Sequence, residues 1–398
     1  MQQDKLLANN NVLWMGVVSF FTDFASSLVM PILPIFVVLV LDQGVDKFGL
    51  VVATTTLVSY LLRFVGGALS DRYQNNKVFL LLGYGLSALA KPFLTFSGSW
   101  IDVAAIRSSE RLGKALRAAP KDKLLSSSVR RDAIGRGIGL HKAIEKSGEL
   151  LGLVCLLAVI HYLGSSEAVF RGIFSASLIP GILALVVLAG LVKETATQAS
   201  TDKKSAFSFV IEPQLKRPIV AYSLLCLFMF NEAFFILAGN NLGITLPTIL
   251  SIYIVSRAIQ IIVSLKIGAL IDASSVQRLL TVGYCAGLGA LLLLLVGNMP
   301  SFVIAFVLLG IYELITLNTI RSYIGRHAID KGATFGALYF LVAIASAFGA
   351  YWLGIVWQFW GLGASIVVST LGVVASGILI VWLLKTEAKS SNDIKLSN

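Results

Sequence analysis

The sequence predicts an all-α, polytopic membrane protein with twelve transmembrane helices arranged as two pseudo-symmetric six-helix bundles. The first observation is composition: 57% of the 398 residues are hydrophobic and 13% are charged, whereas about a quarter of the residues in a soluble domain are charged. The second is that apolar stretches near the ~20 residues that cross a bilayer recur along the whole chain. The third is a short motif that occurs once in each half of the chain.

Short polar or Gly/Pro-rich breaks separate the apolar stretches and set the boundaries of the expected spans. In order, the spans are 12–41, 48–70, 78–97, 100–117, 136–162, 170–192, 218–239, 244–270, 279–298, 301–322, 334–357 and 362–384. The first span is too long for a secretory signal and contains Asp23. It also lacks a small-residue cleavage site, so we expect it to remain in the mature protein.

Lysine and arginine are concentrated in alternate breaks. One set of breaks contains Arg72, Lys77, Lys121, Lys123, Arg130, Arg131, Arg136, Lys193, Lys203, Lys204, Lys216, Arg217, Arg326, Lys331 and Lys385. The opposite set holds little more than Lys47 and Arg171. Because positively charged loops stay in the cytoplasm, we expect a bacterial inner-membrane protein with both termini cytoplasmic. The net charge of +11 then reflects topology and attraction to anionic lipid, and nucleic acid is not an expected partner.

The cysteines and histidines do not suggest a metal or cofactor. Cys155, Cys226 and Cys285 lie inside apolar spans and show no paired spacing. The three histidines are far apart in the sequence and form no metal-binding motif. We therefore expect no disulfide framework, no metal site and no cofactor.

The recurring motif is Gly-Ala-Leu-x-Asp. It spans 67–71 at the end of the second span and 268–272 at the end of the eighth. A repeat at equivalent places indicates two related halves. The polar stretch 193–217 between them reads as a linker, so we expect bundles at 1–192 and 218–398.

Three motifs resemble the major facilitator superfamily, and the resemblance covers the whole chain. The signature between the second and third helices is matched by Gly67, Leu69, Asp71 and Arg72, although Gln74, Asn75 and Asn76 depart from its basic ending. A P-v-x-P motif is matched by Pro31, Ile32, Leu33 and Pro34. A fourth-helix motif is matched by Arg107, Glu110 and Gly113.

The resemblance implies secondary transport by alternating access, with a cytoplasmic gate. In that gate Asp71 would face the positive N-terminus of the eleventh helix and basic groups such as Arg117. Gly67 and Arg72 would belong to the same gate, with Gly268 and Asp272 as the symmetric counterpart. The alternative is that Gly67 and Asp71 only form a tight loop and a helix end.

The fourth and fifth spans carry charged residues that a plain hydrophobic bundle does not need. The fourth contains Arg107, Glu110, Arg111 and Lys114, and the fifth contains His141, Lys142, Glu145, Lys146 and Glu149. Each residue's depth in the membrane can be counted along its helix at about 1.5 Å per residue. Pairing residues of opposite charge at equal depth predicts three interhelical ion pairs. These are Arg107 with Glu149, Glu110 with Lys146, and Arg111 with Glu145.

Two interpretations of these charges stay open. In one, the pairs only satisfy each other, because an unpaired buried charge is costly. In the other, some of them line a cavity and bind substrate, and the excess of cations favours an anionic group. Lys91 and Arg63 add to that excess, or extend to an interface instead. The candidate substrate-binding residues are Arg107, Glu110, Arg111, Lys146, Glu149 and Asn231.

Asp23, about halfway across the first span, is the first candidate for proton coupling, because ionisable groups at membrane depth are usually functional. The alternative is a carboxylate neutralised by Arg63 or another cation. The other candidates for carrying the proton are Glu145, Glu149, Glu232 and Glu313.

The expected function is proton-coupled secondary transport of a small organic solute, anionic or amphiphilic, with export slightly favoured. Uptake of an organic anion or siderophore-like nutrient is the alternative. A transport-inactive receptor or an intramembrane enzyme is the alternative of another class, but the charged residues form no familiar catalytic set, so no enzyme is expected. The expected partners are a small-molecule substrate, protons and membrane lipids, and the expected state is a monomer.

Overall fold

The structure is a computed structural model of the 398-residue chain. It describes residues 10–73, 76–129, 134–194, 211–329 and 331–396. Within these ranges, the structure describes only the backbone of residues 61, 63–73, 134–136, 213, 214, 265, 268, 269, 272, 273, 331, 332 and 379–396. The fold is all-α, as the sequence predicts.

The contacts divide the chain into two compact units. The first comprises Met1–Ala206 with Thr245–Ile254, and the second comprises Phe207–Ile244 with Val255–Asn398. The expected division into 1–192, a linker and 218–398 remains a prediction.

The helices up to Leu191 cover the first six expected spans, although the helix at the fourth span extends to Ser127 and not to 117. They are α1 (Asn11–Val29), α2 (Leu33–Ile35), the π-helical η1 (Phe36–Val40), α3 (Val45–Tyr73), α4 (Asn76–Phe93), the 3₁₀ turn η2 (Leu94–Phe96), α5 (Trp100–Ser127), α6 (Ile134–Leu163), α7 (Glu167–Ala176) and α8 (Leu178–Leu191). Side-chain caps mark several starts. Ser99 and Asp102 form a capping box at α5, and Ser166 caps α7.

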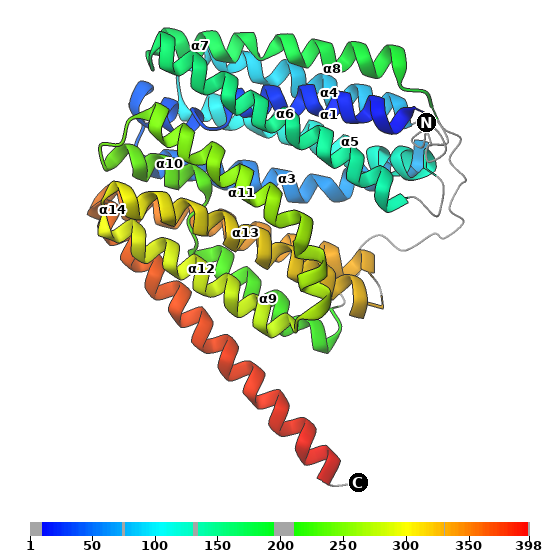
Figure 1. The fold of residues 1–398 in the computed structure, drawn as a ribbon, viewed down its shortest axis with the longest axis vertical. Coiled ribbons are helices and arrows are strands. Elements are labelled where there is room, and N and C mark those ends of the chain that lie inside the picture. The colour runs from blue at the N-terminus through cyan, green and yellow to red at the C-terminus, as the bar shows by residue number, and fades with distance from the viewer. Residues whose placement is uncertain (1–9, 74–75, 130–133, 195–210, 330, 397–398) are drawn as a thin grey trace. The chain divides into compact units, whose positions relative to one another are not determined.

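Within the first unit, α1 packs against α6 and α8, whereas α5 packs against α3 and α4 (Figure 1). Glycines allow two of these contacts to be close. A Cβ on Gly152 of α6 would lie 2.6 Å from the Phe24 carbonyl oxygen of α1, and one on Gly113 of α5 would lie 2.6 Å from the Gly83 oxygen of α4. Such contacts bring the polar faces of neighbouring helices together.

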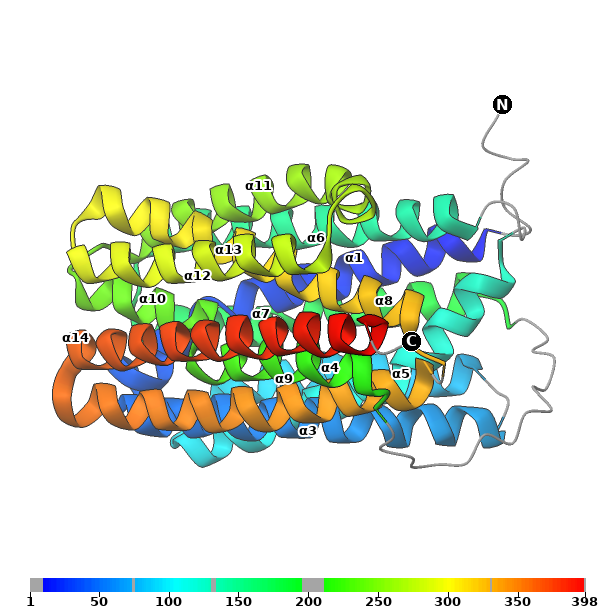
Figure 2. The same ribbon diagram turned by 90° about the horizontal axis from the view of Figure 1, so that it is seen from below.

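The helices after the linker are α9 (Pro213–Phe228), α10 (Glu232–Asn241), α11 (Leu246–Ala273), α12 (Val276–Val296), α13 (Met299–His327) and α14 (Lys331–Leu396). In the second unit α12 packs against α13, and α9 packs against α14. The α14 segment contains a non-helical Gly361 with φ of 85°. The chain reverses direction there, so α14 supplies both the eleventh and the twelfth expected spans (Figure 2).

The seventh expected span, 218–239, is interrupted. Helix α9 ends at Phe228, Met229 is extended, and α10 begins at Glu232 with Asn231 as its N-cap. The Asn231 side-chain oxygen accepts hydrogen bonds from the backbone N–H groups of Ala233 and Phe234. The expected span is therefore present as the apolar segment Leu215–Asn241, but it consists of two helices because Asn231 caps a new helix start within it.

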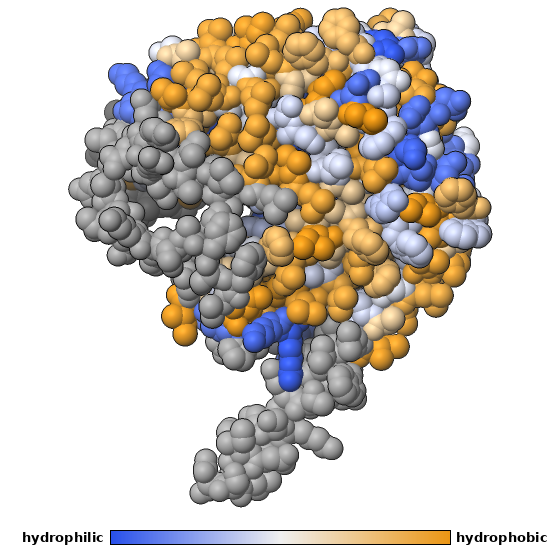
Figure 3. Space-filling model, turned by 180° about the vertical axis from the view of Figure 1, so that it is seen from behind, coloured by the Kyte–Doolittle hydropathy of each residue, from blue (hydrophilic) through white to orange (hydrophobic). Residues whose placement is uncertain are grey.

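Apolar side chains cover most of the face shown in Figure 3. Exposed examples at helix ends include Phe96, Tyr162, Phe359 and Trp360. Eight segments of the described chain are long and apolar enough to cross a membrane. Helices α3, α5 and α6 are not among them, and α5 and α6 carry the charged residues of the site.

Candidate functional site

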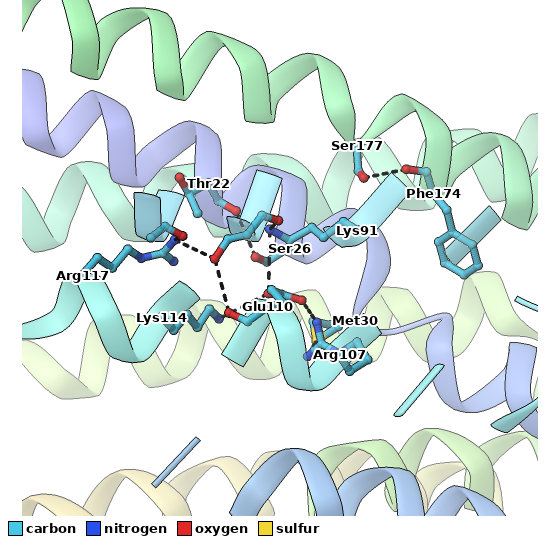
Figure 4. Close-up of polar contacts among 12 residues, drawn as sticks. Thr22, Ser26, Met30, Lys91, Arg107, Glu110, Lys114, Arg117, Phe174 and Ser177 are labelled. Carbon is cyan, nitrogen blue, oxygen red and sulfur yellow. Dashed lines mark hydrogen bonds and ion pairs between the residues drawn. The ribbon is translucent and has the colours of Figure 1, made fainter. Parts of the chain in front are cut away.

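Three cations surround one carboxylate inside the first unit (Figure 4). Lys91 of α4 and Arg107 and Glu110 of α5 are nearly inaccessible, with relative exposures of 1%, 3% and 1%. Glu110 forms an ion pair with Arg107, and its other oxygen lies 3.8 Å from the Lys91 ammonium and 3.9 Å from that of Lys114. We call Lys91, Arg107, Glu110 and Lys114 the cationic cluster.

Local backbone contacts hold the cationic cluster in place. Lys91 donates a hydrogen bond to the Ser87 carbonyl one turn earlier, and the Ser87 hydroxyl donates to the Glu110 carbonyl of α5. Arg107 reaches α1 through a contact of 2.9 Å with Met30 Sδ. These contacts require α4 and α5 to be close, which the Gly83–Gly113 approach allows. Lys91 does not extend to an interface, so that alternative for Lys91 is wrong.

The cationic cluster has an excess of positive charge. Its three cations form ion pairs with the one carboxylate of Glu110, and the charges of Arg111, Arg117 and Asp23 also act on Lys91. A further anionic group would offset the repulsion among these cations, because like charges repel more strongly in a low-dielectric interior than in water. The arrangement suits the binding of a carboxylate, sulfonate or phosphate group, and arginine and lysine are the side chains best suited to such groups.

A second polar group, which we call the inner network, joins four helices. The Ser19 hydroxyl of α1 lies 3.4 Å from the Tyr84 hydroxyl of α4 and 3.1 Å from His141 Nε2 of α6. His141 Nδ1 lies 3.7 Å from Glu145 Oε2, and Lys121 of α5 donates to the same oxygen at 3.3 Å. The inner network thus links α1, α4, α5 and α6 through side chains alone.

Arg117 lies between the cationic cluster and the inner network. Its guanidinium donates to the Ser87 hydroxyl at 3.0 Å and lies 4.1 Å from the centre of the Tyr84 ring. These described contacts attach Arg117 to α4. The other gate residues, Gly67, Asp71, Arg72, Gly268 and Asp272, fall where side chains are outside the description. The gate remains a prediction.

Asp23 of α1 is partly buried, and the described part of the chain provides no hydrogen-bond or ion-pair partner for it. The charges that act on Asp23 include those of Glu145, Glu149, Lys114 and Lys146, and Asp23 also interacts with Lys91 and Lys121. Asp23 therefore faces charges from both α5 and α6. Arg63, the alternative partner, has a side chain outside the description.

All three predicted interhelical ion pairs are wrong. Arg107 pairs with Glu110 three residues later, and Lys146 pairs with Glu149 in the same way. Glu145 pairs with Lys121 and Lys142, not with Arg111. Helices α5 and α6 follow each other in the chain, but α5 packs mainly against α3 and α4, and α6 against α1. Residues of α5 and α6 at the same depth in the membrane therefore do not come into contact.

The second unit has its own ionisable group, which we call the Glu232 cluster. Arg257 of α11 donates to Glu232 at 2.5 Å and to the Gln260 side-chain oxygen at 3.0 Å. Glu313 of α13 interacts electrostatically with Glu232 and Arg257. The substrate candidate Asn231 precedes this group as the α10 N-cap, so its side-chain oxygen is already occupied by backbone N–H groups.

Sequence reasoning missed Arg257, Gln260 and the role of Lys121. Arg257 lies inside the apolar segment Leu246–Ser264, and a charged residue in such a segment is itself a sign of function. Applying that rule to every span would have found it. Among the described residues, no group of three or more histidine, cysteine or acidic side chains is placed to hold a metal ion.

Comparison with known proteins gives a consistent result. The model of the Major Facilitator Superfamily matches residues 15–350. An uncharacterised MFS-type transporter of Methanocaldococcus jannaschii is 28% identical over 389 residues, covering 94% of this chain and 95% of that protein.

Two solved structures show the same fold at low identity. The nucleoside transporter NupG superimposes with a TM-score of 0.76 at 11% identity, covering 95% of this chain and 99% of its own. A bacterial homologue of the human lysosomal transporter Spinster, in an inward-facing occupied conformation, gives a TM-score of 0.75 at 14% identity, covering 95% and 98%.

Proposed function

Because the chain belongs to the major facilitator superfamily, we propose that it is a proton-coupled secondary transporter of a small organic anion. Membership of this family makes it a multi-pass membrane transporter. The nature of the substrate, the coupling ion and the direction of transport are the parts that we propose.

The cationic cluster is the observation that supports an anionic substrate. The buried cations Lys91 and Arg107 and the partly exposed Lys114 lie around the Glu110 carboxylate, and together they leave an excess of positive charge that an anionic group would neutralise. In a low-dielectric interior the electrostatic attraction between such a group and each cation is stronger than it would be in water. Glu110 and the substrate would then share the same cations, and Arg107 and Lys91 would be direct binding residues.

The coupling ion is proposed from the buried carboxyl groups. The candidates are Asp23, Glu145 and Glu149 in the first unit and Glu232 and Glu313 in the second. Glu145 and Glu149 are already paired with lysines of the same helix, which makes them poorer proton carriers than Asp23. We propose export as the direction and cytoplasmic termini as the topology, the latter from the distribution of lysine and arginine.

The test is a thermal-shift screen of the purified protein against benzoate, citrate and glucose 6-phosphate, with glucose and choline as uncharged and cationic controls. A ligand that binds the native state raises the unfolding midpoint. We expect stabilisation by at least one anion and by neither control. Flux of that anion is then measured in proteoliposomes with an imposed pH gradient of either sign, which separates export from uptake.

A pair of matched variants connects the result to the site. In Lys91→Gln we expect binding of the anion to weaken about tenfold or more, since a hydrogen bond to a charged group contributes about 1.5–3 kcal/mol. In Lys47→Gln, a lysine paired with Asp46 at the start of α3, we expect unchanged affinity. Equal affinities in both variants, or stabilisation by choline alone, would refute an anion site at the cationic cluster.

A further inference from the structure

Arg117 of α5 is a buried cation for which the described residues provide no carboxylate. Its relative exposure is 7%. Both of its described hydrogen bonds are made by Nη1, to the Ser87 hydroxyl at 3.0 Å and the Gly83 carbonyl at 3.5 Å. The Tyr84 ring lies 4.1 Å from the guanidinium. These three partners are neutral, so they hold the guanidinium without balancing its charge, and they leave its Nε and Nη2 donors for a ligand.

The lysines next to Arg117 also have donors left for a ligand. Lys91 makes one described hydrogen bond, to the Ser87 carbonyl at 3.2 Å, whereas an ammonium group has three donors. The Lys91 and Lys114 ammonium groups lie 3.8 and 3.9 Å from Glu110 Oε1, which is too far for a hydrogen bond. That buried oxygen accepts no hydrogen bond from the described residues. Both ammonium groups can therefore donate to a further acceptor.

Ser87 of α4 joins Lys91 to Arg117. Its hydroxyl accepts from Arg117 and its carbonyl accepts from Lys91, so one small, fully buried residue contacts both cations. The same hydroxyl donates to the backbone carbonyl of Glu110 on α5. The separation of the two cations is therefore fixed by the contact between α4 and α5, and it does not depend on a flexible surface side chain.

The α5 face that carries Arg117 holds more positive charge than its carboxylate balances. Arg107, Glu110, Lys114 and Arg117 follow one another at spacings of three and four residues, which places them on one face of the helix (Figure 4). Lys91 from α4 lies against the same face. Four cations therefore surround the single carboxylate of Glu110.

Asp23 of α1 reduces this excess without removing it. Its carboxylate acts on both Lys91 and Lys114. With Asp23 ionised, four cations still exceed the two carboxylates by two charges. Glu145 and Glu149, which also act on Asp23, have lysine partners of their own. A ligand with one negative charge leaves part of this excess, whereas a doubly negative group balances it.

We infer that Arg117 is a substrate-binding residue and that, together with Lys91, it binds a doubly negative group of the substrate, of the phosphate or phosphonate type. This inference rests on the proposed function and narrows its anion to a dianion. A phosphate group offers three acceptor oxygens. The planar fork of Arg117 suits two of them, and the Lys91 ammonium suits the third.

Asp71 is the alternative partner of Arg117, through the gate expected from the sequence, and its side chain lies outside the description. The two assignments predict different results. If Asp71 balances Arg117, a ligand does not need the guanidinium, and replacing Arg117 leaves the preference for a dianion unchanged. If Arg117 binds the substrate, the same replacement removes that preference.

The test compares phenyl phosphate with phenyl sulfate at about pH 8. The two compounds have the same shape, but the phosphate carries two negative charges there, since its second pKa is about 6, and the sulfate carries one. Thermal-shift titrations of the purified full-length protein give the affinity for each compound. Because the electrostatic energy scales with the charge of the ligand, we expect the wild type to bind phenyl phosphate about tenfold or more tightly than phenyl sulfate.

Three variants locate the preference. Arg117→Gln should weaken phenyl phosphate by about a hundredfold if it weakens phenyl sulfate by about tenfold, since loss of one cation costs a dianion twice as much. A purely structural role would lower both affinities by the same factor. Lys91→Gln should reduce the preference in the same way, so the test stands if Arg117→Gln does not fold. Arg278→Gln, at an exposed arginine of α12, should change neither affinity.

The outcomes separate this inference from the proposed function. Equal binding of the two compounds by the wild type, or an unchanged preference in Arg117→Gln, would overturn the inference and leave an anion transporter. Stabilisation by benzoate but not by phenyl phosphate would do the same. If no anion stabilises the protein, the proposed substrate class fails together with the inference.

Discussion

Among single residues, Glu110 determines the charge balance of the cationic cluster. It is the only carboxylate that the described contacts provide for Lys91, Arg107 and Lys114 together. A buried ion pair contributes little net stability, but removing only one of its partners destabilises the fold strongly. The reason is that the remaining charge is left uncompensated in a medium of low dielectric constant.

We therefore expect Glu110→Gln to lower the free energy of unfolding by about 3–5 kcal/mol. Lys91→Gln should cost less, since Glu110 keeps Arg107 and Lys114. Denaturant unfolding in detergent measures both. Glu167→Gln is the control, because its exposed pair with Arg171 should contribute less than about 1 kcal/mol. Equal losses in Glu110→Gln and Glu167→Gln would show that the cationic cluster does not depend on this carboxylate.

The sequence was sufficient to identify most of the charged residues but not their partners. Arg107, Glu110 and Glu145 could be found because charge inside an apolar span is rare. Their pairing depends on how each helix is rotated about its axis and on which helix packs against it. A residue's position along its helix gives neither piece of information. The spacing of three between Arg107 and Glu110, or Lys146 and Glu149, already permitted pairs within one helix.

Among the elements, the helices were predictable and their irregularities were not. Long apolar runs have one stable form in a bilayer, because every backbone group must be paired within the segment. The break before Glu232 depends on one side chain, Asn231, that satisfies the new helix end. The signal was present as an Asn-Glu pair within the seventh span, in the order typical of a helix start.

The contact between α1 and α6 depends on glycine. A Cβ on Gly148 would overlap the backbone of Phe20, whereas one on Gly139 of the same helix would meet no other atom within 4 Å. We expect Gly148→Ala to lower the free energy of unfolding by about 1–3 kcal/mol, as overpacking does. Gly139→Ala should raise it by up to about 1 kcal/mol, through helix propensity. Both variants replace a glycine of α6 by alanine, so comparing their denaturant unfolding isolates the effect of packing. If Gly148→Ala stabilised the protein, α1 and α6 would not be in tight contact.

For the whole molecule, the order of the helices and the distribution of basic residues together define a topology. With a cytoplasmic N-terminus, the chain crosses from α1 to α6 five times, so the connection between α6 and α7 lies outside the cell and the end of α5 lies inside. Ser165 and Ser126 are exposed residues at these two places. They allow the orientation to be tested independently of any substrate.

We expect a membrane-impermeant maleimide to label Ser165→Cys in intact cells and Ser126→Cys only after permeabilisation. The background is a protein in which Cys155, Cys226 and Cys285 are replaced by alanine. The physical reason is that Lys121, Lys123 and the other basic residues near Ser126 resist transfer across the membrane, whereas the 164–166 connection carries no basic residue. Labelling of both variants after permeabilisation shows that each thiol is reactive. The reverse pattern in intact cells would invert the topology, and with it the assignment of the charged linker and the proposed gate to the cytoplasmic side.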